Sequence, residues 1–218
     1  MPRSTTATAS DSGQRRASYQ RARSHATKRA LVQAAMALWR TNGYATTTVA
    51  DICRAAGVSR ALFYFYFPAK EDVLFEVGVL STRAAQKTVR SLMRGDYDVE
   101  DVIAGALRSL EKSMSRNPPE LVTAAVLEGY RQQHRLLSGD RVTDLDADMF
   151  GELFAVAQRD GKLDARVDVN HLSRVAHMLV SEGVRHWASG EFTGPFAETV
   201  AHDIAALIAG YRVLSTDT

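Results

Sequence analysis

Cysteine is almost absent from this chain of 218 residues, because Cys53 is the only one. An intrachain disulfide is therefore impossible, which is typical of proteins that work in a reducing compartment. Long apolar runs are also missing, so no segment is predicted to cross a membrane. The first residues are polar and contain no apolar segment of the kind found in secretory signals. We therefore expect a cytoplasmic protein.

Signatures of catalysis are missing as well. The sequence contains no Gly-x-Ser-x-Gly elbow, no phosphate-binding loop and no dinucleotide fingerprint. Its six histidines include no pair four residues apart. His171, His177 and His186 share one predicted helix at separations of six and nine residues, which do not converge on a metal ion. We expect no enzyme, no metal site and no cofactor.

Two smaller features favour structural interpretations. The stretch Asp144–Asp148 resembles the start of a calcium loop, but Met149 stands where glycine is required and Ala155 where a bidentate glutamate is required. Cys53 lies on the apolar side of a short predicted helix, so a packed core thiol is favoured over a redox thiol. Neither feature predicts a site.

The net charge of +2 conceals an uneven distribution. Residues 1–70 carry 11 Lys and Arg against two Asp, a balance of 11 − 2 = +9. Residues 71–218 carry 16 against 23 acidic residues, a balance of 16 − 23 = −7. The positive charge of residues 1–70 predicts that this part of the chain, and not the rest, binds a polyanionic partner. A solubilising tail is the alternative, and charge does not decide between the two.

The first residues differ in composition from those that follow. Residues 1–22 are rich in Ser, Thr, Ala, Gln and Arg and nearly free of large apolar residues, which predicts a disordered basic arm. From Thr27 onward, apolar residues recur at helical spacing. Asn42-Gly43 is expected to end this helix.

The stretch "GVSRALFYFYFPAKE" holds five consecutive aromatic residues, at positions 63–67. Their alternation of Phe and Tyr would suit a half-buried strand. However, Thr47 or Thr48 can cap a short helix, Gly57 ends it, and Ser59 caps another, which is the spacing of a helix-turn-helix. On that second helix Phe63 and Phe67 share one face.

The rest of the chain is predicted to be helical, without a convincing strand. Further helices are expected at about 70–94, 99–115, 120–133, 141–159, 169–189 and 196–214. The prediction is therefore an all-α fold of about nine helices. Residues 23–69 form a three-helix helix-turn-helix domain and residues 70–218 a second helical domain.

Residues 27–75 resemble the DNA-binding domain of TetR-type transcriptional regulators. In "TVADICRAAGVSRALFYFYFPAKEDVL", a helix ending in Ala-Gly-Val, a Ser-initiated helix and the pattern Tyr-x-Tyr/His-Phe-x-x-Lys-Glu fall in register. The resemblance covers roughly a quarter of the chain. It implies a homodimeric DNA-binding regulator whose second domain holds a small-molecule pocket.

The expected DNA contacts follow from this motif. Arg60 is the best candidate to read bases, because a guanidinium fork binds guanine O6 and N7 together. The resemblance assigns phosphate contacts to Tyr64, Tyr66 and Lys70. The family often has Gly-Thr where this chain has Ala61-Leu62, so no hydroxyl is available at position 62, although leucine can touch a thymine methyl. The full predicted set is Thr47, Thr48, Ser59, Arg60, Ala61, Tyr64, Tyr66 and Lys70. The role of Phe65 stays open between packing on DNA sugars and filling a local gap.

The second domain is predicted to bind an unknown apolar small-molecule effector and to form the dimer. The candidate pocket residues are Tyr130, Phe150, Phe154, His171, Met178 and Trp187, for each of which ordinary core packing is the alternative. The last two predicted helices are apolar with many small residues that permit close helix contact, for example Ala201, Ala205, Ala206 and Ala209. A self-contained core is possible there, but the resemblance favours a homodimer through these helices.

The sequence thus predicts a ligand-responsive repressor that binds a palindromic double-stranded DNA operator as a homodimer. One alternative is an all-helical small-molecule-binding or catalytic protein whose helix-turn-helix does not read DNA. Another is a transcriptional activator or an architectural factor. The basic arm either reaches into the minor groove or adds non-specific attraction, and we favour the second.

Overall fold

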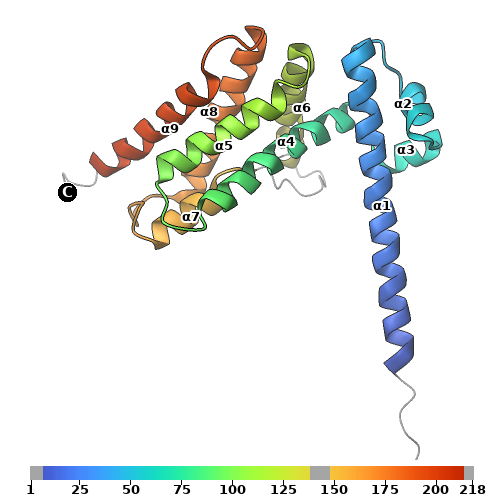
Figure 1. The fold of residues 1–218 in the computed structure, drawn as a ribbon, viewed down its shortest axis with the longest axis horizontal. Helices are drawn as coiled ribbons and strands as arrows, with labels where there is room; N and C mark the ends of the chain where they lie inside the picture. The colour runs from blue at the N-terminus through green and yellow to red at the C-terminus, as the bar shows by residue number, and fades with distance from the viewer. Residues whose placement is uncertain (1–6, 138–147, 214–218) are drawn as a thin grey trace, which may run out of the picture. The chain divides into compact units, whose positions relative to one another are not determined.

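Helices provide all the regular structure in the computed structural model, which describes residues 7–137 and 148–213 (Figure 1). In chain order they are α1 (Ala7–Asn42), α2 (Val49–Ala56), α3 (Arg60–Tyr66), α4 (Lys70–Leu92), α5 (Val99–Met114), α6 (Pro119–Leu137), α7 (Gly151–Arg159), α8 (Val169–Ser189) and α9 (Phe196–Val213). No strand occurs in these residues, so the predicted all-α class is confirmed. The chain divides into two units, 1–73 and 74–218, with the boundary inside α4 and four residues after the predicted one.

Helix α1 is longer than the sequence suggests. Residues 7–22, predicted to be disordered, are helical in the structure. Gly13 is the only glycine of α1, and Ala, Gln and Arg are good helix formers. A helix already anchored by its packed part extends without a new nucleation step, so a lack of apolar residues does not prevent extension. The predicted end at Asn42 is confirmed, and Gly43 follows with φ +84°.

The first unit is built around one small core. Helix α1 packs on α2, and α2 packs on α3. The buried side chains that join them are Leu31, Val32, Ala35, Trp39, Ile52, Cys53, Phe63 and Phe67. Cys53 is 4% exposed, and burial raises the pKa of its thiol, so the packed core thiol is confirmed.

The second unit contains the larger core. Within it α5 packs on α9, α6 and α7 pack on α8, and α8 packs on α9. Its largest fully buried side chains are Leu74, Ile103, Leu107, Leu110, Phe150, Leu153, Phe154 and Leu172. Among the described residues, no helix has the length and apolar character needed to cross a membrane.

Helix α7 starts at Gly151, whereas the sequence predicts a helix from residue 141. The side chain of Asp148 explains the new start. Its Oδ1 accepts hydrogen bonds from the amides of Phe150 at 3.2 Å and Gly151 at 2.8 Å. Such bonds satisfy amides that lack a partner in the first turn of a helix. Residues 141–147 lie outside the described part of the chain.

Candidate DNA-binding surface and ligand cavity

Local capping signals build the turn between α2 and α3. Thr48 and Asp51 form a reciprocal capping box, with N···O distances of 3.2 and 3.0 Å. Gly57 ends α2 in the left-handed region at φ +67°, where glycine has no steric penalty. The hydroxyl of Ser59 then accepts the amide of Leu62 at 3.1 Å and starts α3. The predicted helix-turn-helix is therefore confirmed, with Thr48 rather than Thr47 as the first cap.

The aromatic residues of α3 divide between two faces. Phe63 is 0% exposed and Phe67 is 2% exposed, and both belong to the core of the first unit. Tyr64 is 51% exposed and Phe65 is 77% exposed. The buried pair anchors α3, and the exposed pair is available to a partner.

The other predicted contact residues of α3 also lie at the surface. Ser59, Arg60 and Ala61 are exposed, and Tyr66 is half-buried with its ring 5.0 Å from that of Phe65. Because Arg60 is exposed at the start of α3, its guanidinium is free of the core. These positions are compatible with entry of the helix into a groove.

Lys70 serves a purpose that the sequence did not suggest. Its Nζ donates to the backbone oxygen of Tyr44 at 2.9 Å and to that of Thr47 at 3.1 Å, and it lies 4.2 Å from the centre of the Tyr44 ring. An ammonium group has three donors, so one stays available for a phosphate. Thr47 itself is 2% exposed and donates its hydroxyl to the oxygen of Gly43 at 2.8 Å. Contrary to expectation, the Thr47 side chain is not part of the exposed surface.

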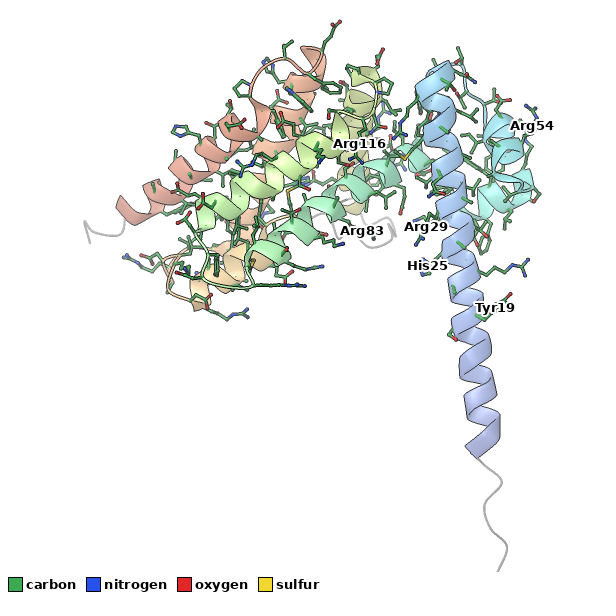
Figure 2. The ribbon with its side chains drawn as sticks, viewed as in Figure 1. Tyr19, His25, Arg29, Arg54, Arg83 and Arg116 are labelled. Atoms are coloured by element: carbon green, nitrogen blue, oxygen red, sulfur yellow. The ribbon has the colours of Figure 1, made fainter. Side chains whose placement is uncertain are left out.

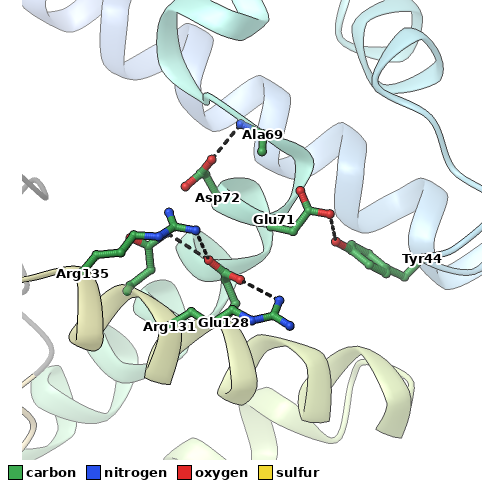
Figure 3. A network of polar contacts seen from close by, with 8 residues as sticks. Tyr44, Ala69, Glu71, Asp72, Glu128, Arg131 and Arg135 are labelled. Carbon is green, nitrogen blue, oxygen red and sulfur yellow. Dashed lines mark hydrogen bonds and ion pairs between the residues drawn. The ribbon is translucent and has the colours of Figure 1, made fainter. Parts of the chain in front are cut away.

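Further polar contacts fix the start of α4 (Figure 3). The hydroxyl of Tyr44 donates to Glu71 Oε1 at 3.1 Å, and the amide of Ala69 donates to Asp72 Oδ2 at 2.7 Å. The segment between α1 and α2 is thereby tied to the residues that carry Lys70. The segment between α1 and α2 and the start of α4 are therefore held together by side-chain hydrogen bonds.

Exposed basic and aromatic side chains lie on α1 and α2. Figure 2 marks Tyr19, His25 and Arg29 on α1 and Arg54 on α2. All four are exposed. Arg54 forms an ion pair of 3.0 Å with Asp51. Such exposed pairs add little stability, so Arg54 can exchange this partner for a phosphate at small cost.

The second unit contains a partly open cavity of about 480 Å³, within the usual range for ligand sites. Side chains of α4, α5, α6 and α8 line it, together with Asp148 and Met149. The lining residues of the first three helices are Phe75, Gly78, Val79, Thr82, Leu110, Met114, Ala125, Val126, Gly129, Tyr130 and Gln133.

The character of the cavity changes along α8. The lining residues in its first half are Asn170, Ser173, Arg174 and His177, and those in its second half are Val180, Ser181 and Val184. At a rise of about 1.5 Å per residue, this row extends over roughly 21 Å. The cavity is therefore elongated, with a polar part at the start of α8 and a more apolar part towards its end.

Asp148 and His177 set the electrostatics of the polar part. Ser173 is 6% exposed and donates its hydroxyl to Asp148 Oδ1 at 2.7 Å. Burial lowers the pKa of His177, and the charge of Asp148 partly opposes this effect. The imidazole is therefore neutral at neutral pH. His177 was not predicted to line the cavity. Its position, four residues after Ser173 and seven before Val184, does place these three lining residues on one face of α8.

One of the six predicted pocket residues lines the cavity. Tyr130 does so. Phe150 and Phe154 are at most 1% exposed and fill the core, and Trp187 is 6% exposed and packs on Phe192 and Phe196. His171 and Met178 are exposed on α8 and lie outside the cavity. Phe150, Phe154 and Trp187 fill space in the core instead of surrounding the cavity.

The described residues contain no group of three or more His, Cys, Asp and Glu side chains suited to a metal ion. Of the calcium-like stretch, Asp144 and Asp146 lie outside the described residues. Asp148 is engaged with Ser173 and the start of α7.

A helix-turn-helix with an exposed second helix defines a class of DNA-binding proteins. Residues 31–77 match the family model described as bacterial regulatory proteins, tetR family. This part of the chain therefore belongs to the TetR family of transcriptional regulators.

A curated relative supports this assignment in part of the chain. The HTH-type transcriptional regulator EthR of Mycolicibacterium smegmatis is 44% identical over 48 residues. The match covers 22% of this chain and 22% of EthR.

Solved structures show the same fold over most of the chain. Thermus thermophilus FadR in complex with lauroyl-CoA has a TM-score of 0.64 at 24% identity, covering 84% of this chain and 93% of FadR. Bacillus subtilis FadR in complex with stearoyl-CoA has a TM-score of 0.58 at 17% identity, covering 83% and 97%. RolR in complex with resorcinol has a TM-score of 0.58 at 15% identity, covering 85% and 89%.

Proposed function

We propose that this protein is a cytoplasmic, ligand-responsive repressor that binds a palindromic DNA operator as a homodimer. The observation that carries the proposal is the division of α3, whose buried Phe63 and Phe67 hold it while Arg60, Tyr64 and Phe65 face outward. The balance of +9 over residues 1–70 supports a polyanionic partner for the same region.

The homodimer would form through α8 and α9. Ala206 and Ala209 are exposed on α9, and Ala201 and Ala205 are half-buried. Met178 on α8 is 62% exposed. Small side chains on α9 allow a symmetry mate to approach closely, and the exposed apolar side chain of Met178 on α8 would be covered in the same contact, which supports a four-helix interface.

The effector would be an elongated apolar molecule with a polar or anionic end. Val180 and Val184 suit its apolar body, while Asn170, Arg174 and His177 suit its polar end. The FadR proteins of similar fold hold lauroyl-CoA and stearoyl-CoA, so long-chain acyl compounds are the first to test.

The proposed mechanism couples the two units. A dimer places two recognition helices in successive major grooves, about 34–36 Å apart. An effector can bind more tightly to a conformation in which the two recognition helices are a different distance apart. Its binding then favours that conformation and lowers the affinity for DNA, by as much as its affinities for the two conformations differ. The operator is then released and transcription begins.

The test begins with selection of bound DNA from random sequence by the full-length protein. We expect a palindromic consensus, and release of that DNA by lauroyl-CoA or stearoyl-CoA but not by acetyl-CoA. Arg174→Met should weaken the response to the effector by about tenfold, as expected for loss of a charge-assisted contact. Arg108→Met is the matched control, because Arg108 is exposed and does not line the cavity. Recovery of no preferred sequence would refute the DNA-binding role, and activation of transcription by the unliganded protein would refute repression.

A further inference from the structure

The outward face of α3 is apolar. Successive residues of a helix are about 100° apart, so Phe65 lies about 200° from both Phe63 and Phe67, and Ala61 lies about 200° from Phe63. Phe63 and Phe67 point into the core, and the opposite face therefore centres on Ala61 and Phe65. Leu62, half-buried, lies beside this face.

Phe65 is unusual among the phenylalanines of the chain. All eight lie in the described residues, and the other seven are buried or half-buried, whereas Phe65 is 77% exposed. A fully exposed aromatic ring leaves a large apolar area in water, and burying that area against a partner is favourable. The edge-to-face contact with Tyr66, at 5.0 Å, limits the orientations of the ring.

The surroundings of this face indicate which partner covers it. Arg60 and Tyr64 flank it on α3, and residues 1–70 carry a balance of +9. An apolar face surrounded by basic residues suits a partner that is anionic overall and presents apolar groups where the helix contacts it. In the major groove of DNA that apolar group is the C5-methyl of thymine, which contacts Ala and Phe side chains.

We propose that Phe65, supported by Ala61, is a specificity-determining residue that reads a thymine methyl group in each operator half-site. The inference rests on the proposed function and adds a second mode of readout. Arg60 selects a base by hydrogen bonds, whereas Phe65 selects one by apolar contact. The operator therefore contains, in each half-site, a thymine whose methyl group is required.

The experiment replaces each thymine of the selected operator in turn by deoxyuridine, which lacks the C5-methyl and pairs identically. For the wild-type protein, loss of one methyl contact should weaken binding about fourfold, hence about 16-fold for a palindrome altered in both half-sites. Phe65→Ala should bind the thymine and deoxyuridine operators within about twofold of each other, because the contact is already gone.

Two further variants separate this role from others. Phe65→Leu keeps an apolar side chain and should retain part of the discrimination between thymine and deoxyuridine. Tyr64→Phe removes a hydroxyl suited to phosphate and should weaken both operators equally, leaving their ratio unchanged. Circular dichroism should show the same helical content for all three variants, because the substituted side chains are exposed.

The outcomes are distinguishable. If no preferred sequence is recovered at all, the proposed function fails and the inference fails with it. If a consensus is recovered but every thymine tolerates deoxyuridine, the inference alone is overturned. The inference alone is also overturned if deoxyuridine substitution lowers the operator affinity of wild type and of Phe65→Ala by the same factor. Full DNA affinity and an unchanged consensus for Phe65→Ala would also overturn it, and would assign this face to a protein partner.

Discussion

Among the cavity-lining residues that the structure describes, His177 is the side chain that changes charge near neutral pH. Burial lowers the pKa of His177 in the folded protein, while the charge of Asp148 partly opposes that shift. The other charged group facing the cavity is Arg174, with the phenol of Tyr130 nearby on α6. The unfolded chain takes up a proton at higher pH than the folded one, so His177 favours unfolding as the pH falls below about 6.5.

We therefore expect the thermal midpoint of the wild-type protein to fall more between pH 7.5 and pH 5.5 than that of His177→Gln. Thermal melts followed by circular dichroism at several pH values measure this difference. His202→Gln is the control, because His202 is exposed on α9 and should follow the wild type. If the thermal midpoint falls equally in wild type and His177→Gln between pH 7.5 and pH 5.5, His177 is not the residue that destabilises the protein in acid.

Side chains that form hydrogen bonds with residues close by in the sequence could be predicted. Side chains that form hydrogen bonds with residues far away in the sequence could not. The caps Thr48, Gly57 and Ser59 could be predicted because each depends on residues within three or four positions. Lys70 reaches back 23 and 26 residues to two carbonyl oxygens. No pattern in the chain records such a contact, because it depends on how α1, α2 and α4 pack.

Helices α8 and α9 approach closely at Gly183. A Cβ added there would lie 2.5 Å from Cγ2 of Val200 and 3.2 Å from Cε2 of Phe196, and both side chains are buried. Valine in a helix has little rotamer freedom, so the clash cannot be relieved by side-chain rotation. Gly183→Ala should therefore destabilise the protein by about 1–2 kcal/mol, the overpacking cost less the gain in helix propensity.

The matched control for that prediction is Gly129→Ala on α6, where an added Cβ meets nothing within 4 Å. Helix propensity then acts alone and should stabilise the protein by about 0.5–1 kcal/mol. Urea unfolding of both variants measures the two free energies. Effects of the same sign in the two variants would show that the close contact at Gly183 does not limit stability.

Helix boundaries were predictable where a local signal is strong. Gly43 and Gly57 mark the ends of α1 and α2, as predicted. The start of α7 depends instead on Asp148, which Ser173 holds from a distance of 25 residues. The start of α1 was missed for a different reason, because a helix that is anchored at one end extends through residues with no apolar face.

For the whole molecule, the fold class could be predicted from helical periodicity, and the two-unit organisation from the helix-turn-helix spacing and the family resemblance that it carries. The cavity could not. Its lining combines small, polar and large apolar residues from four helices, and each of these residues on its own resembles an ordinary surface or core position. A void is defined by the side chains that surround it, so its position follows only from the packed structure.

Residues 1–22 provide a test of how the basic part of the molecule binds DNA. Deleting them removes Arg3, Arg15, Arg16 and Arg21 and one acid, Asp11. Each lost phosphate contact lowers the slope of log affinity against log salt by about 0.9, so we expect a decrease of roughly 1–4. The selected consensus should stay the same, since phosphate contacts carry no sequence information.

Binding titrations of the full-length and truncated proteins at several salt concentrations measure the slopes, and random-sequence selection compares the consensus. Replacing Arg15, Arg16 and Arg21 by Gln in the full-length chain is the control, because it removes charge but keeps the length of the segment. The substituted protein should reproduce most of the change in slope. A consensus that loses A·T base pairs at its flanks after truncation would show instead that this segment reads the minor groove, because side chains there distinguish A·T from G·C pairs.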